Sequence, residues 1–358
     1  MTFRDPTSKV QSSLQKMLSD IFSGLPPSQK KLYYRLLCTN GSAPAIYGLP
    51  KIHKIGTPLR PIVDYTRSPL FKLSGYLHKV LAPLVGKSAT HIKNSQDFIE
   101  NIKDVTLDEN DILVSFDVCS LFTSVPVELA VHTCKEALKN DPSFPDRMPL
   151  EVGEITELLR FCLANTYFVY NGTLYEQIFG TAMGASISVT AANLTMEAIE
   201  SKALNSFKPR PKVFLRYVDD CFCILNKQNL QSFLDHLNAT EPSINFTVEE
   251  EMNGSIPFLD INVKRAACRL SFSVFRKPTH SGRYLDFESS HPLAHKRSVI
   301  SSLLNRARNV CADPESFSNE LKVIKKDLER NGYPRNLVNN RSKNLQRTRG
   351  NEMEAQKP

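Results

Sequence analysis

The sequence has no tryptophan, no long apolar run and no cysteine pair of the CxxC kind. No stretch approaches the ~20 apolar residues of a transmembrane helix, and the opening MTFRDPTSKVQ lacks the apolar core of a signal peptide. The eight cysteines lie inside apolar segments, which argues against a zinc ribbon and favours a reducing compartment. We therefore expect an intracellular protein without a membrane partner.

Positive charge is unevenly distributed along the 358 residues. Residues 264–349 hold 19 Lys and Arg against 7 Asp and Glu, whereas residues 1–263 hold 25 against 28. A basic region beside a near-neutral body is typical of a surface for a polyanion, with nucleic acid the first candidate and anionic membrane the second. A solvated Lys and Arg surface without a partner explains the charge alone equally well. The length and the 41% hydrophobic content predict a globular protein with two or three domains, or one large enzyme body with a small appendage.

Two adjacent acids occupy the middle of the apolar stretch FLRYVDDCFCIL, at positions 214–225. The residues around Asp219 and Asp220 predict a strand or a tight hairpin, in which a buried carboxylate needs a cation. An isolated Asp-Asp pair is more often a solvent-facing turn, so this pair needs a third ligand. Asp117 follows the predicted strand 112–116, where a lone acid is commonly a helix cap or a turn residue. Together the three acids predict a site for two Mg²⁺ ions in phosphoryl transfer.

Helices and short hairpins are predicted around these acids. Apolar residues at three- and four-residue spacing predict helices over 70–85, 95–102, 127–140, 151–165 and 230–237. Length and helix propensity predict a further helix over 191–204. Asn171-Gly172 predicts a tight turn between two short strands. The small residues over 180–188 predict a loop that lets a backbone or a ligand approach closely. Alternation predicts one strand in INFTVEEE and one in IPFLDINV.

Seven blocks occur in one order: YGLPKIHK, PLRPIV, SFDVCSLFTSVP, GTAMGASIS, RYVDD, IPFLDINV and FRKPTHSGRYLDFESSHPLAHKRSVISSLLNRA. With them the chain resembles the reverse transcriptase of a Penelope-like retroelement over roughly residues 40–310. The resemblance implies an α+β right-hand polymerase fold, with fingers, an antiparallel β palm with flanking helices, and a helical thumb. The implied domains are fingers (41–110), a palm (111–275, with a finger insertion at about 127–180), and a palm-thumb junction and thumb (276–330). Helical patterns predict an N-terminal helical extension over 1–40, and the abundance of Asn, Arg, Ser and Gln predicts a basic, disordered tail over 331–358.

The resemblance also implies a chemistry, with an RNA template, a DNA primer and dNTPs as substrates and two Mg²⁺ ions, or Mn²⁺, as cofactors. Asp117, Asp219 and Asp220 match the catalytic, metal-binding carboxylates. Phe122, five residues after the first acid, matches an aromatic residue that blocks the ribose 2′-OH. The other matches to nucleotide-binding positions are Lys51 and Arg60 in the fingers, Met183 and Gly184 beside nucleotide and template, and Tyr217 near the primer end.

The basic C-terminal block is interpreted as the palm-thumb junction that grips the primer-template backbone. The predicted nucleic-acid contacts are Lys54, Arg276, Lys277, Arg283, Lys296 and Arg297. His280, His291 and His295 could be metal ligands instead, but no fourth ligand is evident and Pro292 favours a helix that starts after His291. A further helix is expected near Pro314.

Three departures from the family pattern keep rival interpretations open. AMGASISVT lacks the prolines of many relatives, INFTVEEEMNGS offers no Lys as a general acid, and the absence of a GIY-YIG endonuclease predicts a truncated copy. One rival is a catalytically inactive nucleic-acid-binding remnant, although a remnant has no chemical reason to keep all three acids. Another is a template-independent or RNA-making polymerase, which YVDD and Phe122 disfavour. A retroelement protein is expected in the nucleus rather than the cytoplasm, whereas the sequence predicts neither the oligomeric state nor the copied RNA.

Overall fold

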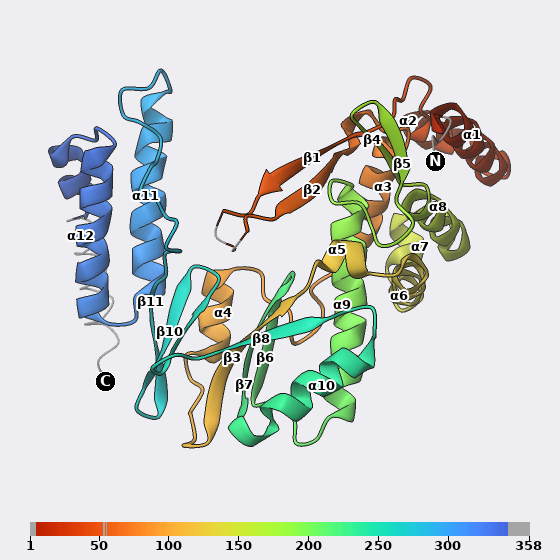
Figure 1. The fold of residues 1–358 in the computed structure, drawn as a ribbon. Helices are drawn as coiled ribbons and strands as arrows, with labels where there is room; N and C mark the ends of the chain where they lie inside the picture. Colours follow the sequence, from red (N-terminus) through yellow and green to blue (C-terminus); the bar gives the residue numbers. More distant parts are fainter. Residues whose placement is uncertain (1–4, 53, 55, 343–358) are drawn as a thin grey trace. The chain divides into compact units, whose positions relative to one another are not determined.

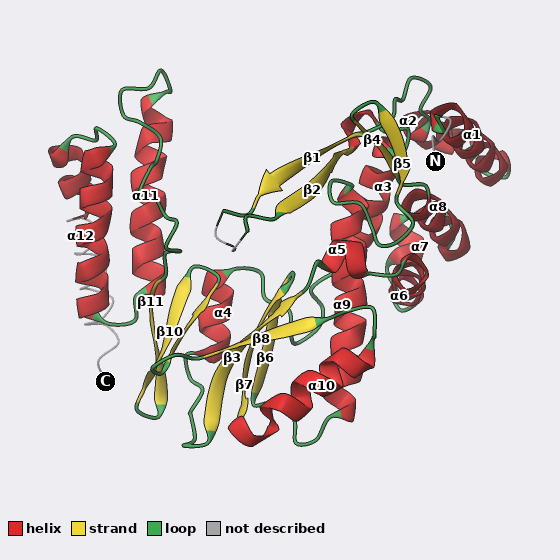
Figure 2. Cartoon of the chain, in the orientation of Figure 1, coloured by secondary structure: helices red, strands yellow, loops and turns green. Residues whose placement is uncertain are grey.

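The computed structural model describes residues 5–52, 54 and 56–342, which form two compact units (Figure 1 and Figure 2). Unit 1 contains Met1–His91, Phe116–Pro211 and Asn229–Val248, and unit 2 contains Ile92–Ser115, Lys212–Gln228 and Glu249–Pro358. Each unit is therefore assembled from segments that are far apart in the sequence. Among the described helices, none has both the length and the apolar content to cross a membrane.

Helices make up most of unit 1. They are α1 (Thr7–Ser23), α2 (Lys30–Leu36), α3 (Phe71–Leu81), α5 (Leu121–Ser124), α6 (Val127–Lys139), α7 (Phe144–Arg147), α8 (Val152–Ala164), α9 (Ser186–Ser206) and α10 (Leu230–Thr240). The predicted helices over 127–140, 151–165 and 230–237 are confirmed. The predicted helix over 70–85 ends at Leu81, since the ring of Pro83 interrupts the α-helical pattern and a 3₁₀ turn follows.

A four-stranded sheet of order β2-β1-β4-β5 also belongs to unit 1. Its strands are β1 (Ala45–Pro50), β2 (Leu59–Asp64), β4 (Tyr167–Tyr170) and β5 (Thr173–Glu176). β1 runs antiparallel to β2 and parallel to β4. The predicted turn at Asn171-Gly172 joins β4 to β5, with the positive φ angles of 48° and 75° that a type I′ turn requires.

Helix α9 starts at Ser186, within the segment 180–188 that was predicted to be a loop. The predicted helix 191–204 therefore begins five residues later than the observed helix. The Ile187 N–H donates to Ser74 Oγ at 3.1 Å, which satisfies one of the N–H groups that a first helical turn leaves unpaired. Small side chains let this turn pack inside the protein, where Ile187 and Ser188 are buried.

The central sheet has the order β6-β7-β3-β8. Its strands are β3 (Asp111–Val118), β6 (Val213–Tyr217), β7 (Asp220–Asn226) and β8 (Phe246–Glu250). β3 has neighbours on both sides and is mostly buried, as expected of the predicted apolar strand. Helix α4 (Ser95–Ile102), predicted from the sequence, packs Phe98 against Phe222 and Phe258 with ring centroids 4.9 and 4.6 Å apart. These rings fix β7 in the core of unit 2.

A second sheet in unit 2 has the order β11-β10-β9 and corrects one prediction. Its strands are β9 (Ser255–Phe258), β10 (Ile261–Ala266) and β11 (Arg269–Val274). The single strand predicted for IPFLDINV is wrong, because Phe258 pairs antiparallel with Ile261 across a turn. Leu259 adopts a φ of 55° in that turn, a conformation that a sequence pattern does not predict for leucine.

Two long helices of unit 2, α11 (Leu293–Val310) and α12 (Pro314–Arg330), share a core of their own. α11 begins after Pro292, as predicted, and α12 begins at the predicted Pro314. The aliphatic residues in this core include Ile300, Leu304, Leu321, Ile324 and Leu328.

The segment 331–342 is ordered, which corrects the first part of the predicted disordered tail. Residues 335–342 are helical, and Tyr333 and Val338 are buried in the core of α11 and α12. The Tyr333 hydroxyl donates to the Leu285 carbonyl at 2.8 Å. Two large apolar residues thus dock a segment whose composition is otherwise polar. Residues 343–358 of the predicted tail lie outside the described part of the chain.

Candidate active site

Asp219 and Asp220 lie at the tight turn between β6 and β7 in unit 2, as the sequence predicts. Tyr217 pairs with Asp220, so Val218 and Asp219 form the two-residue turn. Val218 has a φ of 58°, which is unfavourable for a β-branched residue and marks a strained turn. Both acids are partly exposed.

A buried arginine supports this turn. Arg216 is fully buried, and its Nη1 donates to the Val218 carbonyl at 3.0 Å. The hydrogen bond satisfies the carbonyl of the strained residue, next to Asp219 in the turn. Sequence reasoning missed Arg216, although a charged residue inside the apolar run FLRY was a usable signal.

Asp117 lies near the end of β3, in the part of that strand assigned to unit 1. Its side chain is 42% exposed, and Lys54 Nζ lies 3.6 Å from its Oδ2. The Asp117 carbonyl accepts a hydrogen bond from Thr247 Oγ1 at 3.3 Å. Because an exposed ion pair contributes little, a divalent cation could displace Lys54 from this carboxylate.

The strands that carry the three acids are neighbours in the central sheet. β3 lies beside β7, and Ser115 Oγ donates to the Cys221 carbonyl at 3.3 Å. Ser115 precedes Asp117 by two residues, and Cys221 follows Asp219 by two. Within residues 5–342, apart from 53 and 55, no group of three His, Cys, Asp or Glu side chains is arranged to hold a metal ion. The metal site therefore stays a prediction.

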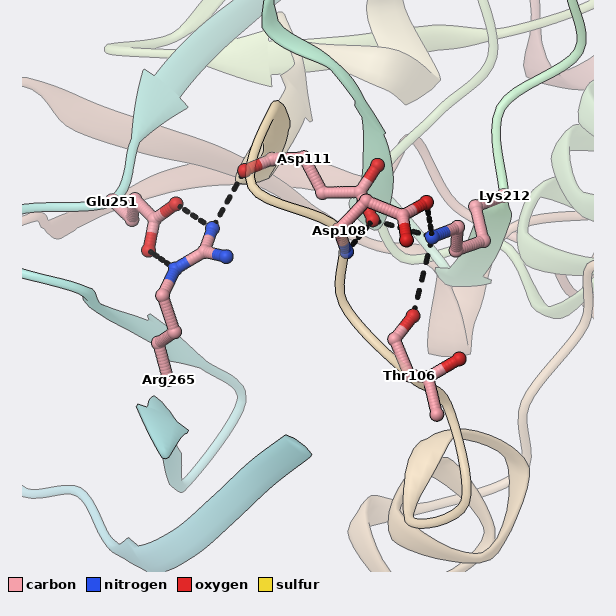
Figure 3. Close-up of polar contacts among 6 residues, drawn as sticks. All are labelled: Thr106, Asp108, Asp111, Lys212, Glu251 and Arg265. Carbon is pink, nitrogen blue, oxygen red and sulfur yellow. Dashed lines mark hydrogen bonds and ion pairs between the residues drawn. The ribbon is translucent and has the colours of Figure 1, made fainter. Parts of the chain in front are cut away.

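Two ion-pair clusters anchor the starts of these strands (Figure 3). Lys212, just before β6, binds Asp108 at 2.8 Å and Asp111 at the start of β3. The hydrogen bond to Asp108 is the main cause that raises the pKa of Lys212. Arg265 of β10 binds Glu251 at 2.6 Å and the Asp111 carbonyl at 2.7 Å. The second sheet is thus tied to β3, an arrangement that the sequence does not reveal.

The basic residues predicted to hold the nucleotide lie on the β1–β2 hairpin of unit 1. Arg60 is exposed on β2 and pairs with Leu49 of β1. The Lys51 N–H donates to the Pro58 carbonyl at 2.9 Å, and the Lys54 N–H donates to the Lys51 carbonyl at 3.0 Å. The hairpin therefore fixes the backbone of these residues and leaves the Arg60 side chain in solvent.

Residues 180–184, which we name the GTAMG loop, form hydrogen bonds to Phe122 and to strand β2. The Thr181 N–H and Oγ1 both donate to the Phe122 carbonyl, at 2.6 and 3.0 Å. The Val63 N–H donates to the Met183 carbonyl at 2.8 Å. Gly184 has a φ of 130°, and a Cβ there would overlap the Val63 carbonyl. The GTAMG loop thus contacts the backbone of Phe122 at one end and that of Val63 at the other, whereas the roles of Phe122, Met183 and Gly184 at the nucleotide stay predictions.

The predicted nucleic-acid contacts of the C-terminal block divide into two groups. Arg276 makes two hydrogen bonds of 2.6 Å to Glu320, which raise its pKa, and Lys296 is buried, with its Nζ donating to the Ser289 carbonyl at 2.6 Å. These two cations therefore contact the protein itself. Lys277, Arg283 and Arg297 are exposed, and their side chains form no hydrogen bond or ion pair with any residue that the structure describes.

Tyr217 and the histidines considered as metal ligands complete the set of predicted site residues. Tyr217 is 37% exposed at the end of β6. His280 lies 3.7 Å from Asp327, and His291 contacts Ser289. Across the described residues these histidines join no metal-binding cluster, so their role as ligands gains no support.

Comparison with known proteins places the fold among polymerases. The chain is similar in structure to telomerase from Candida albicans (TM-score 0.57, 14% identity, covering 90% of this chain and 58% of that one). It is also similar to apo telomerase from Candida tropicalis (TM-score 0.51, 14% identity, 97% and 63%) and to the RNA-dependent RNA polymerase of a human picobirnavirus (TM-score 0.51, 12% identity, 93% and 74%). The chain thus spans less than two thirds of each telomerase. The predicted α+β right-hand polymerase fold is confirmed.

Sequence comparison adds one local match. A family model described as "Animal helix-turn-helix domain" matches residues 283–343, the segment that contains α11 and α12. No curated protein sequence matches the chain.

Proposed function

We propose that this protein is an RNA-directed DNA polymerase of a Penelope-like retroelement, which extends a DNA primer with dNTPs on an RNA template. One observation carries the proposal: the strained turn with Asp219 and Asp220 begins strand β7, whose neighbour β3 carries Asp117. The polymerase fold supports it. The ordered family blocks favour a retroelement enzyme over a viral RNA polymerase.

The proposal assigns the three carboxylates to a pair of divalent cations. Asp117 has an exposed lysine partner that a cation can displace, and Asp219 lies partly exposed at a turn. Asp117, Asp219 and Asp220 would hold two Mg²⁺ ions, with Mn²⁺ as a substitute. When bound, such ions lower the pKa of the primer 3′-OH and neutralise charge on the leaving pyrophosphate.

The remaining residues would bind and orient the substrates. Arg60, with Lys51, would hold the triphosphate, because a guanidinium can bind phosphate oxygens in bidentate fashion. Phe122 would exclude a ribose 2′-OH, Met183 and Gly184 would contact the nucleotide and template, and Tyr217 would lie near the primer end. The exposed cations at 277, 283 and 297 would contact the backbone of the primer-template duplex.

Primer extension tests the proposal. The full chain is incubated with an RNA template, a DNA primer, dNTPs and Mg²⁺, and we expect extension that is lost in Asp219→Ala. The matched control is Asp235→Ala, which removes an exposed acid on α10 and should extend as the wild type does. Equal extension by the Asp219 variant would refute the assignment.

A second candidate is a nucleic-acid-binding remnant without catalysis. The helix-turn-helix match over 283–343 and the exposed cations within it favour this alternative. Salt-sensitive RNA binding by the wild type, without any extension product under the conditions above, would establish it.

A further inference from the structure

The carbonyl of Phe122 cannot complete a normal helical hydrogen bond. Phe122 lies in the one-turn helix α5 (Leu121–Ser124), where the Val125 N–H donates to the Leu121 carbonyl at 3.1 Å. The next donor in that series would be residue 126, which is Pro126 and has no N–H. The Phe122 carbonyl therefore needs a donor from elsewhere.

Thr181 supplies that donor twice. Its N–H and its hydroxyl both reach the Phe122 carbonyl, at 2.6 and 3.0 Å, so both lone pairs of this oxygen are used. Thr181 is fully buried, and water therefore cannot replace its hydroxyl at low cost. The two bonds substitute for the helical partner that Pro126 removes.

The GTAMG loop holds Thr181 rigidly against α5. Gly180 has a φ of 74°, and a Cβ there would overlap the backbone of Thr123. At the other end of the loop, Met183 and Gly184 contact Val63 of β2. Thr181 thus lies between two close backbone contacts and has little freedom to move.

We propose that Thr181 is a positioning residue for sugar selection, acting through the backbone of Phe122. This inference rests on the proposed function, in which the Phe122 ring excludes a ribose 2′-OH. Without the hydroxyl of Thr181, α5 loses one of the two bonds that fix Phe122, and its ring can move away from the sugar. A dNTP has no 2′-OH, so the loss affects ribonucleotides selectively.

The test compares Thr181→Val, which removes the hydroxyl, with Thr181→Ser, which keeps it. The readout is the ratio of kcat/KM for a dNTP to that for the matching rNTP, measured by primer extension with the full chain. A lower fraction of folded enzyme reduces both kcat/KM values equally, so it does not change their ratio. We expect a decrease of about fivefold in the Val variant, the effect of one hydrogen bond, and a wild-type ratio in the Ser variant.

Two further variants keep the outcomes distinct. Thr195→Val removes another fully buried hydroxyl, which donates to the Ala191 carbonyl at 2.8 Å on α9, and should leave the ratio unchanged. Phe122→Ala should lower the ratio most. If Phe122→Ala lowers the ratio and Thr181→Val does not, the inference is overturned and the proposed function stands. If neither changes it, the role of Phe122 in selection is also wrong.

Amide hydrogen exchange gives a readout that needs no catalysis. The N–H groups of Thr123 and Val125 donate within α5, to the carbonyls of Ser120 and Leu121. We expect both to exchange about fivefold faster in Thr181→Val and at the wild-type rate in Thr181→Ser and Thr195→Val. Unchanged exchange would overturn the positioning role even if the wild type extended no primer, and absence of extension would separately refute the proposed function.

Discussion

The two basic regions of the chain use their positive charges differently. On the β1–β2 hairpin, Arg60 is exposed and Lys54 pairs with the partly exposed Asp117. In the C-terminal block, Arg276 and Lys296 bind groups of the protein itself, Glu320 and the Ser289 carbonyl. A count of Lys and Arg therefore measures potential for polyanion binding, whereas burial decides which cations remain free to bind one. Predictions that compare the two regions test this distinction.

The largest effect is expected inside the C-terminal block. Replacing Arg276 in Arg276→Met leaves Glu320, which is 6% exposed, charged and unpaired. We expect the free energy of unfolding to fall by about 3 kcal/mol, measured by urea denaturation followed by circular dichroism. Adding Glu320→Leu should restore part of the loss, because the unpaired charge is removed. A change below about 0.5 kcal/mol in Arg276→Met would show that the pair is not structural.

A smaller effect on binding, and none on stability, is expected at the hairpin. Arg60→Ala should raise the KM for dNTPs about tenfold through loss of a charge-assisted hydrogen bond to phosphate. Its free energy of unfolding should stay within about 0.5 kcal/mol of the wild-type value. Arg160→Ala, which removes an exposed arginine paired with Glu128, serves as the control with unchanged KM. A normal KM in Arg60→Ala would remove the hairpin from triphosphate binding.

The smallest effect is expected for one exposed cation of α11. Arg297→Ala should reduce the slope of log K against log salt for primer-template binding by about one, the release of one counterion. Lys103→Ala, an exposed lysine paired with Glu100, should leave the slope unchanged. Identical slopes for Arg297→Ala and the wild type would exclude Arg297 from the nucleic-acid surface.

Local patterns predicted much of the fold and the elements that carry the acids. A helix with one buried face has apolar residues every three or four positions, and this spacing predicts α4 and α6. A fully buried strand is apolar throughout, so the apolar run before Asp117 predicts β3. The hairpin at Asp219 follows from an apolar stretch interrupted by two acids.

Contacts between distant residues were not predictable in this way. Arg276 resembles a free cation in the sequence, since Glu320 lies 44 positions away. The turn at Leu259 has no glycine to mark it, so two strands resemble one. Thr181 is different: Pro126, four residues after Phe122, already indicates a carbonyl without a helical donor. Only the structure shows which residue provides it.

The most direct test of the central claim is metal-directed cleavage of the protein backbone. Fe²⁺ replaces Mg²⁺ in the full chain, and ascorbate with peroxide generates hydroxyl radicals at the bound ion. If Asp117, Asp219 and Asp220 share divalent cations, the chain will be cut near residue 117 and near residue 219, excess Mg²⁺ will suppress both cuts, and Asp219→Ala will abolish both. Cleavage at only one of the two places, or at neither, would contradict a shared metal site.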